Sequence, residues 1–173
     1  MKTIPGNIFL VGPMGAGKTT IGRRLAQALN RDFADSDREI ERRTGVSIPL
    51  IFEMEGEAGF RAREKAIIAD LTRQSGIVLA TGGGGVLDPA NRLCLTERGF
   101  VIYLKTSVDE QLRRTGRDAN RPLLQTPDPR ARLEELLKIR DPLYREVANF
   151  IVCTDGRYVK RVVQIILRRL EQD

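Results

Sequence analysis

Short apolar runs alternate with amphipathic stretches along the whole chain. The apolar runs cover residues 7–11, 32–34, 77–80, 100–104 and 150–153. Such short runs are typical of strands buried on both faces of a parallel sheet, with helices in the stretches between them. The pattern therefore predicts a three-layer α/β/α domain with about five parallel strands.

Helices are predicted from apolar residues at helical spacing and from capping residues. Three stretches have this spacing: 18–29, 59–74 and 159–170. Asp88 and Asp128 are each followed by proline, which predicts an N-cap with proline at the first helical position. Ser107 with Glu110 three residues later predicts a capping box at the start of another helix.

The length of 173 residues fits one domain, so residues 1–173 are assigned to a single folding unit. No stretch approaches the ~20 apolar residues of a membrane span, and the N-terminus lacks the pattern of a signal peptide. We therefore expect a cytoplasmic protein with no membrane partner. A monomer is a separate expectation, which this pattern does not fix.

Histidine is absent from the sequence. This excludes a Ser-His-Asp triad, a histidine general base and a histidine-containing metal site. Proton transfer at neutral pH therefore falls to carboxylates, Lys, Tyr, Cys or water. The two cysteines, Cys94 and Cys153, stand in apolar segments and are expected to be reduced thiols within a core.

The net charge of +6 leaves two kinds of partner open. A basic surface suits nucleic acid, and it also steers a small anionic substrate. Only 5% of the residues are aromatic and none is tryptophan, so platforms for stacking single-stranded bases are scarce. Charge alone does not choose between these partners.

The clearest motif follows the first predicted strand directly. The segment GPMGAGKTT at 12–20 matches the phosphate-loop pattern G-x-x-x-x-G-K-[ST] between a strand and a helix. Glycines let backbone N–H groups face phosphate oxygens, and the helix N-terminus adds positive potential. Lys18 is expected to reach the β- and γ-phosphates, and Thr19 to ligate Mg²⁺. The predicted ATP-binding residues here are Gly15, Ala16, Gly17, Lys18, Thr19 and Thr20.

A phosphate loop indicates a nucleoside triphosphate and leaves the reaction open. The N-K-x-D motif by which switch GTPases read the base is absent from the sequence. Motor ATPases are generally larger than this chain. Phosphoryl transfer to a small acceptor is therefore the favoured chemistry.

Two carboxylates, Asp35 and Asp37, follow the second predicted strand. Alternation along an extended segment would put both on one face at the carboxyl end of the sheet, beside the phosphate loop. One is then available to the Mg²⁺ shell and the other to an acceptor hydroxyl. The alternative is a solvated turn in which Asp37 caps the next helix.

A second glycine-rich segment, residues 82–85, follows the third predicted strand at 77–80. Its spacing does not fit the dinucleotide-binding pattern, because Leu87 stands where the third glycine belongs. Bare backbone here favours close approach to a ligand, and a flexible turn is the alternative.

Three arginines are candidates for binding anionic groups. Residues 116–129 have little periodicity and predict a mobile loop, from which Arg121 is expected to act as part of a lid on the transferring phosphoryl group. Arg61 and Arg140 have the planar fork that suits a substrate carboxylate, although composition does not single them out.

Taken together, these segments closely resemble shikimate kinase. The segments that carry the resemblance are GPMGAGKTT at 12–20, DSD at 35–37, GFRAREKAII at 59–68, VLATGGGG at 78–85, RPLL at 121–124 and RDPLY at 140–144. They follow one another in the family's order over almost the whole chain. Arg61 and Glu64, followed by a glycine run after a strand, are far more specific than the phosphate loop.

The resemblance implies a P-loop NTPase fold of the nucleoside-monophosphate-kinase type. It implies a single kinase domain with a lid at about 115–127 and a substrate-binding region at about 35–62. The implied reaction moves the γ-phosphoryl group of ATP to the 3-hydroxyl of shikimate, with Mg²⁺, in the biosynthesis of chorismate and the aromatic amino acids. The implied catalytic residues are Lys18, Asp37 and Arg121.

The family's other roles carry over residue by residue. By resemblance, Asp37 contacts the ring hydroxyls of shikimate and takes the reacting proton, while Asp35 belongs to the Mg²⁺ environment. Arg61 and Arg140 would clamp the carboxylate of shikimate. The remaining implied contacts are Gly83 and Gly84 with a hydroxyl group, Arg121 with the phosphates, and Arg114 and Arg157 with the adenine.

Two other interpretations remain beside this one. A related kinase of gluconate or of a nucleotide would share the loop and use another acceptor. A nucleic-acid-binding module would use the basic surface, with salt-dependent affinity. The expected partners are nevertheless ATP and shikimate, without nucleic acid. One departure from the family is Gly85, which stands where many members carry serine and is expected to loosen its turn.

Overall fold

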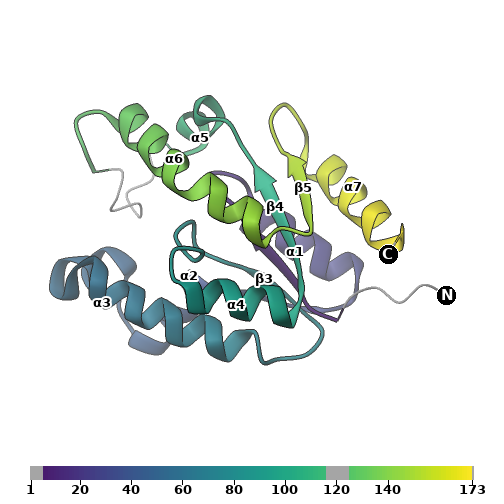
Figure 1. Ribbon diagram of the computed structural model, residues 1–173, viewed down its shortest axis with the longest axis horizontal. Helices are drawn as coiled ribbons and strands as arrows, with labels where there is room; N and C mark the ends of the chain where they lie inside the picture. Colours follow the sequence, from purple (N-terminus) through teal and green to yellow (C-terminus); the bar gives the residue numbers. More distant parts are fainter. Residues whose placement is uncertain (1–5, 116–124, 173) are drawn as a thin grey trace.

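The computed structural model describes residues 6–115 and 125–172, which form a parallel sheet with helices on both faces (Figure 1). The elements are β1 (Ile8–Val11), α1 (Lys18–Ala28), β2 (Asp32–Asp35), α2 (Ser36–Thr44), α3 (Ile48–Leu71), β3 (Ile77–Ala80), α4 (Pro89–Arg98), β4 (Phe100–Lys105), α5 (Val108–Thr115), α6 (Pro129–Val147), β5 (Phe150–Cys153) and α7 (Val159–Gln172). All the predicted strands are present where the apolar runs place them.

The five strands lie in the order β2-β3-β1-β4-β5, so β1 is central. Every neighbouring pair is parallel, and Leu10 of β1 stands between Ala80 of β3 and Ile102 of β4. Because all strands point the same way, the loops after β1, β2 and β3 leave the sheet at one edge. Open α/β sheets bind their ligands at this edge.

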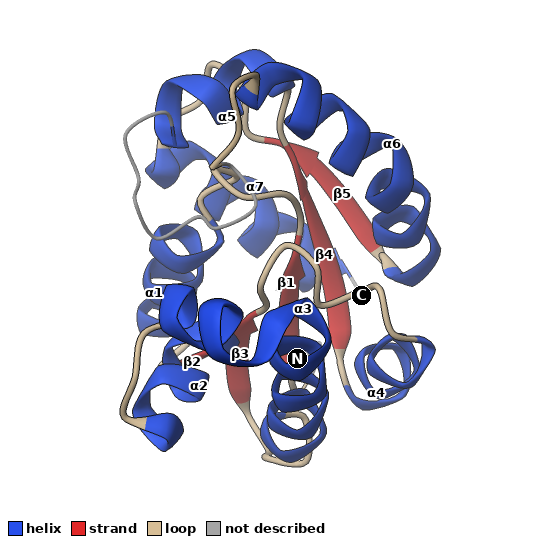
Figure 2. Ribbon diagram, turned by 90° about the vertical axis from the view of Figure 1, so that its left-hand side faces the viewer, coloured by secondary structure: helices blue, strands red, loops and turns tan. Residues whose placement is uncertain are grey.

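Alternate residues of the strands pack into two apolar cores, one on each face of the sheet. Ile8 and Leu10 pack with residues of α1 and α7, whereas Phe9 and Val11 pack with residues of α2, α3, α4 and α6. Central strands covered on both faces are apolar throughout, as a parallel sheet requires. Figure 2 shows the sheet between the two helical layers, which confirms the predicted three-layer architecture.

The segment between β2 and β3 holds more helix than the sequence pattern predicts. The prediction left out α2, and it started the next helix near residue 59, whereas α3 begins at Ile48. Gly56, with φ of 72°, interrupts α3 and divides it into two helical pieces. Glycine adopts this left-handed conformation without strain. The apolar spacing is therefore broken at Gly56. The sequence pattern predicts only the helical piece that follows this residue.

The predicted caps are mostly present. Asp88 and Asp128 cap α4 and α6 through their side chains. The capping box before α5 forms only in part: Ser107 Oγ accepts a hydrogen bond from Glu110 N at 3.2 Å, but the Glu110 carboxylate pairs with Arg113. Arginine one turn away competes for this carboxylate, so the reciprocal half of the box is a wrong prediction.

The expectation that both cysteines lie within a core is wrong. Cys94 is partly exposed, and Cys153, on the edge strand β5, is exposed; both are free thiols. An edge strand has a neighbour on one side only, which leaves part of its surface open to solvent. Within residues 6–115 and 125–172, no helix combines the length and the apolarity that crossing a membrane requires.

Candidate active site

The phosphate loop lies between β1 and α1, as predicted. Gly15 and Gly17 have φ of 80° and 89°, in the left-handed region that favours glycine. Gly17 is the N-cap of α1 and no side chain caps the helix there, so its first N–H groups face the loop. Backbone donors and a helix dipole that converge in this way form a cradle for phosphate.

Lys18 and Thr19 extend from the first turn of α1. Lys18 Nζ donates hydrogen bonds to the carbonyl oxygens of Gly12 and Pro13, at 2.6 and 2.8 Å, so the ammonium group lies beside the loop. Thr19 Oγ1 donates a hydrogen bond to Asp35 Oδ2 at 2.6 Å. This bond joins the first turn of α1, which follows the phosphate loop, to the end of β2.

Asp35 and Asp37 both reach this edge, but not by the predicted route. β2 ends at Asp35, and Asp37 lies in the first turn of α2 rather than on an extended strand. Asp35 Oδ1 accepts hydrogen bonds from the N–H groups of Asp37 and Arg38, at 3.0 and 3.2 Å, and so caps α2. The argument from strand alternation is therefore wrong, and so is the alternative in which Asp37 is the cap.

The glycine run after β3 is a closely packed turn. Gly82 N donates a hydrogen bond to Ser36 Oγ at 3.0 Å. A Cβ at Gly82 would lie 2.7 Å from Asp37 Oδ1, and a Cβ at Gly84 would lie 2.6 Å from Arg61 Cζ. The absence of side chains thus lets a carboxylate and a guanidinium group approach the backbone. A turn that contained glycine only for flexibility would not need this close approach.

The glycine turn packs against three charged side chains, those of Arg61, Glu64 and Arg140. Glu64 is 1% exposed, and its Oε1 accepts a hydrogen bond from Arg61 Nη1 at 3.0 Å. Burial raises the pKa of Glu64, against the opposing effect of the Arg61 guanidinium, and burial lowers the pKa of the Arg140 guanidinium. Arg61 Nε and Glu64 Oε2 are buried without a hydrogen-bond partner among the described residues. Such orphaned polar atoms are costly, which favours a binding role for the cluster.

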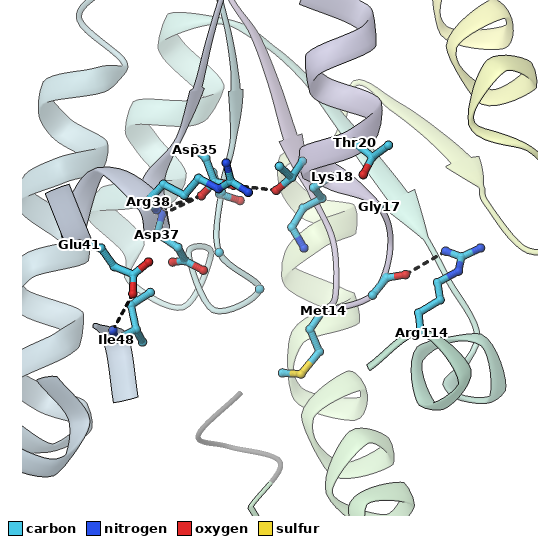
Figure 3. A pocket seen from close by; sticks show the side chains of 15 residues that line it. Met14, Gly17, Lys18, Thr20, Asp35, Asp37, Arg38, Glu41, Ile48 and Arg114 are labelled. Carbon is cyan, nitrogen blue, oxygen red and sulfur yellow. Dashed lines mark hydrogen bonds between the residues drawn. The ribbon is translucent and has the colours of Figure 1, made fainter. Parts of the chain in front are cut away.

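A cavity of about 370 Å³ brings the phosphate loop, the two aspartates and the glycine turn together (Figure 3). It is lined by Met14, Gly15, Gly17, Lys18, Thr19, Thr20, Asp35, Asp37, Arg38, Glu41, Ile48, Thr81, Gly82, Gly83 and Arg114. Figure 3 shows the side chains of Lys18 and Asp37 on opposite sides of it. The predicted site residues outside this lining, among those the structure describes, are Ala16, Arg61, Gly84, Arg140 and Arg157.

Sequence reasoning missed Arg38, Glu41 and Ile48, which line the cavity. Glu41 Oε2 accepts a hydrogen bond from Ile48 N at 3.0 Å and ties the end of α2 to the start of α3. Glu41 stands four residues after Asp37, and residues at this spacing share one face of a helix. Recognition of α2 as a helix would therefore have found Glu41.

The three arginines predicted to bind ATP have different surroundings. Arg114 lines the cavity, and its Nη1 donates a hydrogen bond to Gly15 O at 2.8 Å, which holds it against the phosphate loop. Arg157 lies apart from the lining, and its Nη1 donates to Cys153 O at 2.9 Å. Arg121 and residues 116–124 of the predicted lid lie outside the described residues.

Thr19 and Asp35 fit Mg²⁺ by their chemistry. Mg²⁺ prefers oxygen ligands, and kinase sites hold it with one or two protein groups together with substrate phosphates. The Thr19 hydroxyl and the Asp35 carboxylate are in contact beside the phosphate loop. In the parts of the chain that the structure describes, no three Asp, Glu, His or Cys side chains are grouped to hold a metal ion by themselves. The pair therefore suits an ion that arrives with a triphosphate.

Comparison with known proteins shows the family to which this chain is similar. The family model described as shikimate kinase matches residues 14–171. The shikimate kinase of Thioalkalivibrio sulfidiphilus is 64% identical over 166 residues, which cover 96% of this chain and 87% of the relative. The solved structure of shikimate kinase from Acinetobacter baumannii in complex with shikimate has a TM-score of 0.96 at 55% identity, over 99% of this chain and 95% of that chain.

A more distant solved structure has the same architecture. Shikimate kinase from Aquifex aeolicus has a TM-score of 0.84 at 34% identity, over 95% of this chain and 96% of that chain. The matches extend over the phosphate loop, both aspartates and the glycine turn. This chain therefore belongs to the shikimate kinase family, whose members are ATP-dependent kinases.

Proposed function

We propose that the chain transfers the γ-phosphoryl group of ATP to the 3-hydroxyl group of shikimate and releases ADP and shikimate 3-phosphate. The observation that carries this proposal is that the phosphate loop, Asp37 and the glycine turn meet at the same cavity. The phosphate loop is suited to bind a triphosphate, and Asp37 and the glycine turn are suited to bind an alcohol acceptor. Membership of the family supports shikimate as the acceptor.

The phosphate loop and Lys18 are proposed to bind the triphosphate. Backbone N–H groups and the N-terminus of α1 contact phosphate oxygens, and Lys18 adds a positive charge beside them. Mg²⁺, when bound by Thr19 and Asp35, supplies charge neutralisation on the phosphate oxygens. Arg114 is proposed to contact the adenine end of ATP, with Arg157 beside it.

Arg121 is proposed to complete the positive charge around the transferring group. The reason is its place in the predicted lid, about residues 115–127, since kinases of this type bring a cation onto the phosphates when the lid closes. The transition state is loose and spreads negative charge over the phosphoryl oxygens, so positioning and charge neutralisation dominate catalysis.

Asp37 is proposed to orient the acceptor hydroxyl and to accept its proton. The hydroxyl oxygen forms a bond to the γ-phosphorus as the bond from that phosphorus to the bridging oxygen of ADP breaks, and the proton passes to the Asp37 carboxylate. In a loose transition state the nucleophile needs little activation, so the proton leaves late and a carboxylate suffices. A reaction of this kind needs no histidine.

Arg61 and Arg140 are proposed to bind the carboxylate of the acceptor. A guanidinium group matches a carboxylate with two parallel hydrogen bonds, and such charge-assisted bonds are stronger than neutral ones. Both arginines approach the glycine turn, where the backbone at Gly83 and Gly84 is proposed to meet an acceptor hydroxyl. The acceptor would then lie at the glycine turn, with its hydroxyl group facing the triphosphate.

The test is an assay of ADP formation by the purified chain with ATP and Mg²⁺. We expect ADP to form with shikimate and not with gluconate or nucleoside monophosphates, and the product to be phosphorylated on the 3-hydroxyl. ADP formation with one of the other acceptors alone would assign the chain a different substrate. A labelled oligonucleotide should not bind even at low salt, where electrostatic affinity is greatest.

We also propose that the active form is a cytoplasmic monomer. Its support is that one sheet brings the phosphate loop, both aspartates and the glycine turn together at the same edge. Analytical ultracentrifugation at assay concentrations should give the mass of a single chain, and a dimer there would contradict this proposal.

A further inference from the structure

Tyr144 joins helix α6 to the glycine turn after β3. Its side chain is completely buried, and its hydroxyl donates a 2.5 Å hydrogen bond to the carbonyl oxygen of Gly83. Burial raises the pKa of Tyr144, so the hydroxyl keeps its proton and stays a donor at neutral pH. Gly83 lines the cavity of the active site. A core tyrosine is thus in direct contact with the wall of that site.

Helix α6 brings a second side chain to the same glycine. Arg140 stands four residues before Tyr144, on the same face of the helix. Arg140 Nη1 lies 3.4 Å from the position that a Cβ would take at Gly83. The segment RDPLY at 140–144 therefore supplies both an arginine for the acceptor and a hydroxyl that anchors the turn.

We propose that Tyr144 is a positioning residue that aims the backbone of the glycine turn at the acceptor. This inference rests on the proposed function, in which Gly83 and Gly84 meet an acceptor hydroxyl. In a trans peptide the carbonyl oxygen and the following N–H point in opposite directions, and the group is planar. With the Gly83 carbonyl fixed toward α6, the N–H of Gly84 points away from α6.

A turn made of consecutive glycines needs such an anchor. Glycine has the widest conformational freedom of the residues, so residues 82–85 gain little rigidity from their own backbone. Within the turn, Gly85 N donates a hydrogen bond to Gly82 O at 3.0 Å. The Tyr144 hydroxyl adds a bond from outside, to the peptide group between Gly83 and Gly84. Loss of this bond should let that peptide group rotate.

Tyr103 offers a matched control. It is also fully buried, and its ring centroid lies 4.9 Å from that of Tyr144. Its hydroxyl donates a 2.7 Å hydrogen bond to Asp141 Oδ1, on α6, and not to the turn. Tyr103→Phe and Tyr144→Phe thus each remove one buried hydroxyl from the same ring pair, and only the second removes it from the glycine turn and from beside Arg140.

Steady-state kinetics with shikimate and ATP separate the two variants. Tyr144→Phe should raise KM for shikimate about three- to tenfold, which corresponds to one hydrogen bond, with KM for ATP unchanged. Tyr103→Phe should leave both KM values unchanged while it lowers the melting temperature as much as Tyr144→Phe does. An unchanged KM for shikimate in Tyr144→Phe, or an equal rise in both variants, would overturn the proposal.

Tyrosine fluorescence gives a second test that does not depend on Tyr144→Phe folding. The chain has three tyrosines and no tryptophan, so Tyr103→Phe combined with Tyr158→Phe leaves Tyr144 as the only source of tyrosine emission. Saturating shikimate should change its emission, and a non-hydrolysable ATP analogue alone should not. Unchanged emission, with shikimate binding shown by calorimetry, would overturn the proposal. If shikimate neither binds nor reacts with the unaltered chain, it is the proposed function that fails.

Discussion

Thr19 Oγ1 donates a 2.6 Å hydrogen bond to Asp35 Oδ2, which joins the first turn of α1 to the end of β2. The other oxygen of the Asp35 carboxylate caps α2, the helix that carries Asp37. One side chain therefore serves both the proposed Mg²⁺ site and the placement of the proposed base. These two roles need different properties of the carboxylate, since capping needs an oxygen atom and the metal site needs its charge.

Asp35→Asn should weaken the use of Mg²⁺ and leave stability nearly unchanged. Asn caps helices about as well as Asp, but its amide lacks the negative charge. We expect the apparent Mg²⁺ affinity, from the dependence of the rate on Mg²⁺ at fixed ATP, to fall about 10- to 100-fold, as when groups that support a metal are removed. Asp35→Ala should in addition lose about 1 kcal/mol of unfolding free energy.

The control for Asp35→Ala is Asp88→Ala. Asp88 caps α4 in the same way and does not line the cavity. Its loss should lower the unfolding free energy by a similar amount without changing the dependence on Mg²⁺. A weakened Mg²⁺ dependence in Asp88→Ala would mean that loss of a cap alone disturbs the site.

Asp37→Asn should fold normally, bind ATP and lose most of its turnover. The amide preserves shape but cannot accept the acceptor's proton, and loss of a general base costs on the order of 10²- to 10⁴-fold in kcat. Calorimetric titration with ATP and steady-state kinetics check both parts. Asp32→Asn, at the opposite end of β2, should keep full activity. Full activity in Asp37→Asn would remove this residue from the role of base.

The strands and the phosphate loop were predictable because each carries its own signal. The central strands are buried on both faces and appear in the sequence as apolar runs, and the loop has a fixed spacing that needs no tertiary partner to be recognised. Helix α2 carries no such signal: its sequence, SDREIERRT, has a single buried apolar residue, Ile40. Helix α2 is stabilised by the Asp35 cap and by ion pairs, and these interactions leave no apolar pattern in the sequence. The cavity residues on α2 were therefore missed.

The cluster behind the glycine turn was predictable only through the family resemblance. Arg61 and Arg140 are ordinary members of a chain rich in arginine, and their burial depends on how α3 and α6 pack around the turn. The contact from Tyr144 to Gly83 joins residues 61 positions apart. No local pattern in a single sequence identifies such a pair.

Glu39 provides a test of the ion pairs that hold α2. Hydrogen bonds from Arg42, and then from Arg43, lower the pKa of the Glu39 carboxyl from 4.5 to about 2. Arg43 also pairs with Asp70 of α3 at 2.6 Å, so the group links the two helices. A carboxyl with a lowered pKa in the folded state stabilises the fold above its unfolded pKa, and this contribution is lost as pH falls through the folded value.

The unfolding free energy of the unaltered chain should therefore exceed that of Glu39→Gln at about pH 6, and the difference should shrink as pH falls toward 2 and vanish below it. Chemical denaturation at a series of pH values measures it. Because the arginines are exposed, added salt should reduce the difference at neutral pH. A difference that is constant across this range would show that packing, and not charge, accounts for the effect of Glu39.

Arg61→Ala and Arg140→Ala should each mainly raise KM for the acceptor. A charge-assisted contact contributes about 1.5–3 kcal/mol, which corresponds to a rise of roughly 10- to 150-fold. Arg63→Ala is the control, because Arg63 lies on the same helix as Arg61 and pairs with Glu55 away from the cavity lining. It should leave the acceptor KM unchanged. An unchanged acceptor KM in Arg61→Ala or Arg140→Ala would remove that residue from the site.

Gly84→Ala should impair acceptor binding through Arg61. A Cβ at Gly84 would lie 2.6 Å from Arg61 Cζ, so the guanidinium must move, whereas the φ of Gly84 is not in the left-handed region and alanine adds no backbone strain there. The acceptor KM should rise toward that of Arg61→Ala, with ATP binding unchanged. Gly6→Ala, whose Cβ would meet nothing within 4 Å, should have no effect.

The variant that combines Gly84→Ala with Arg61→Ala decides whether the two residues act together. If Gly84 matters because it leaves room for Arg61, the alanine at 84 costs nothing once the guanidinium is gone, and the double variant should have the acceptor KM of Arg61→Ala alone. Residues in contact show this kind of non-additivity in a double-mutant cycle. Additive effects would instead mean that Gly84 contributes through its own backbone, independently of the arginine behind it.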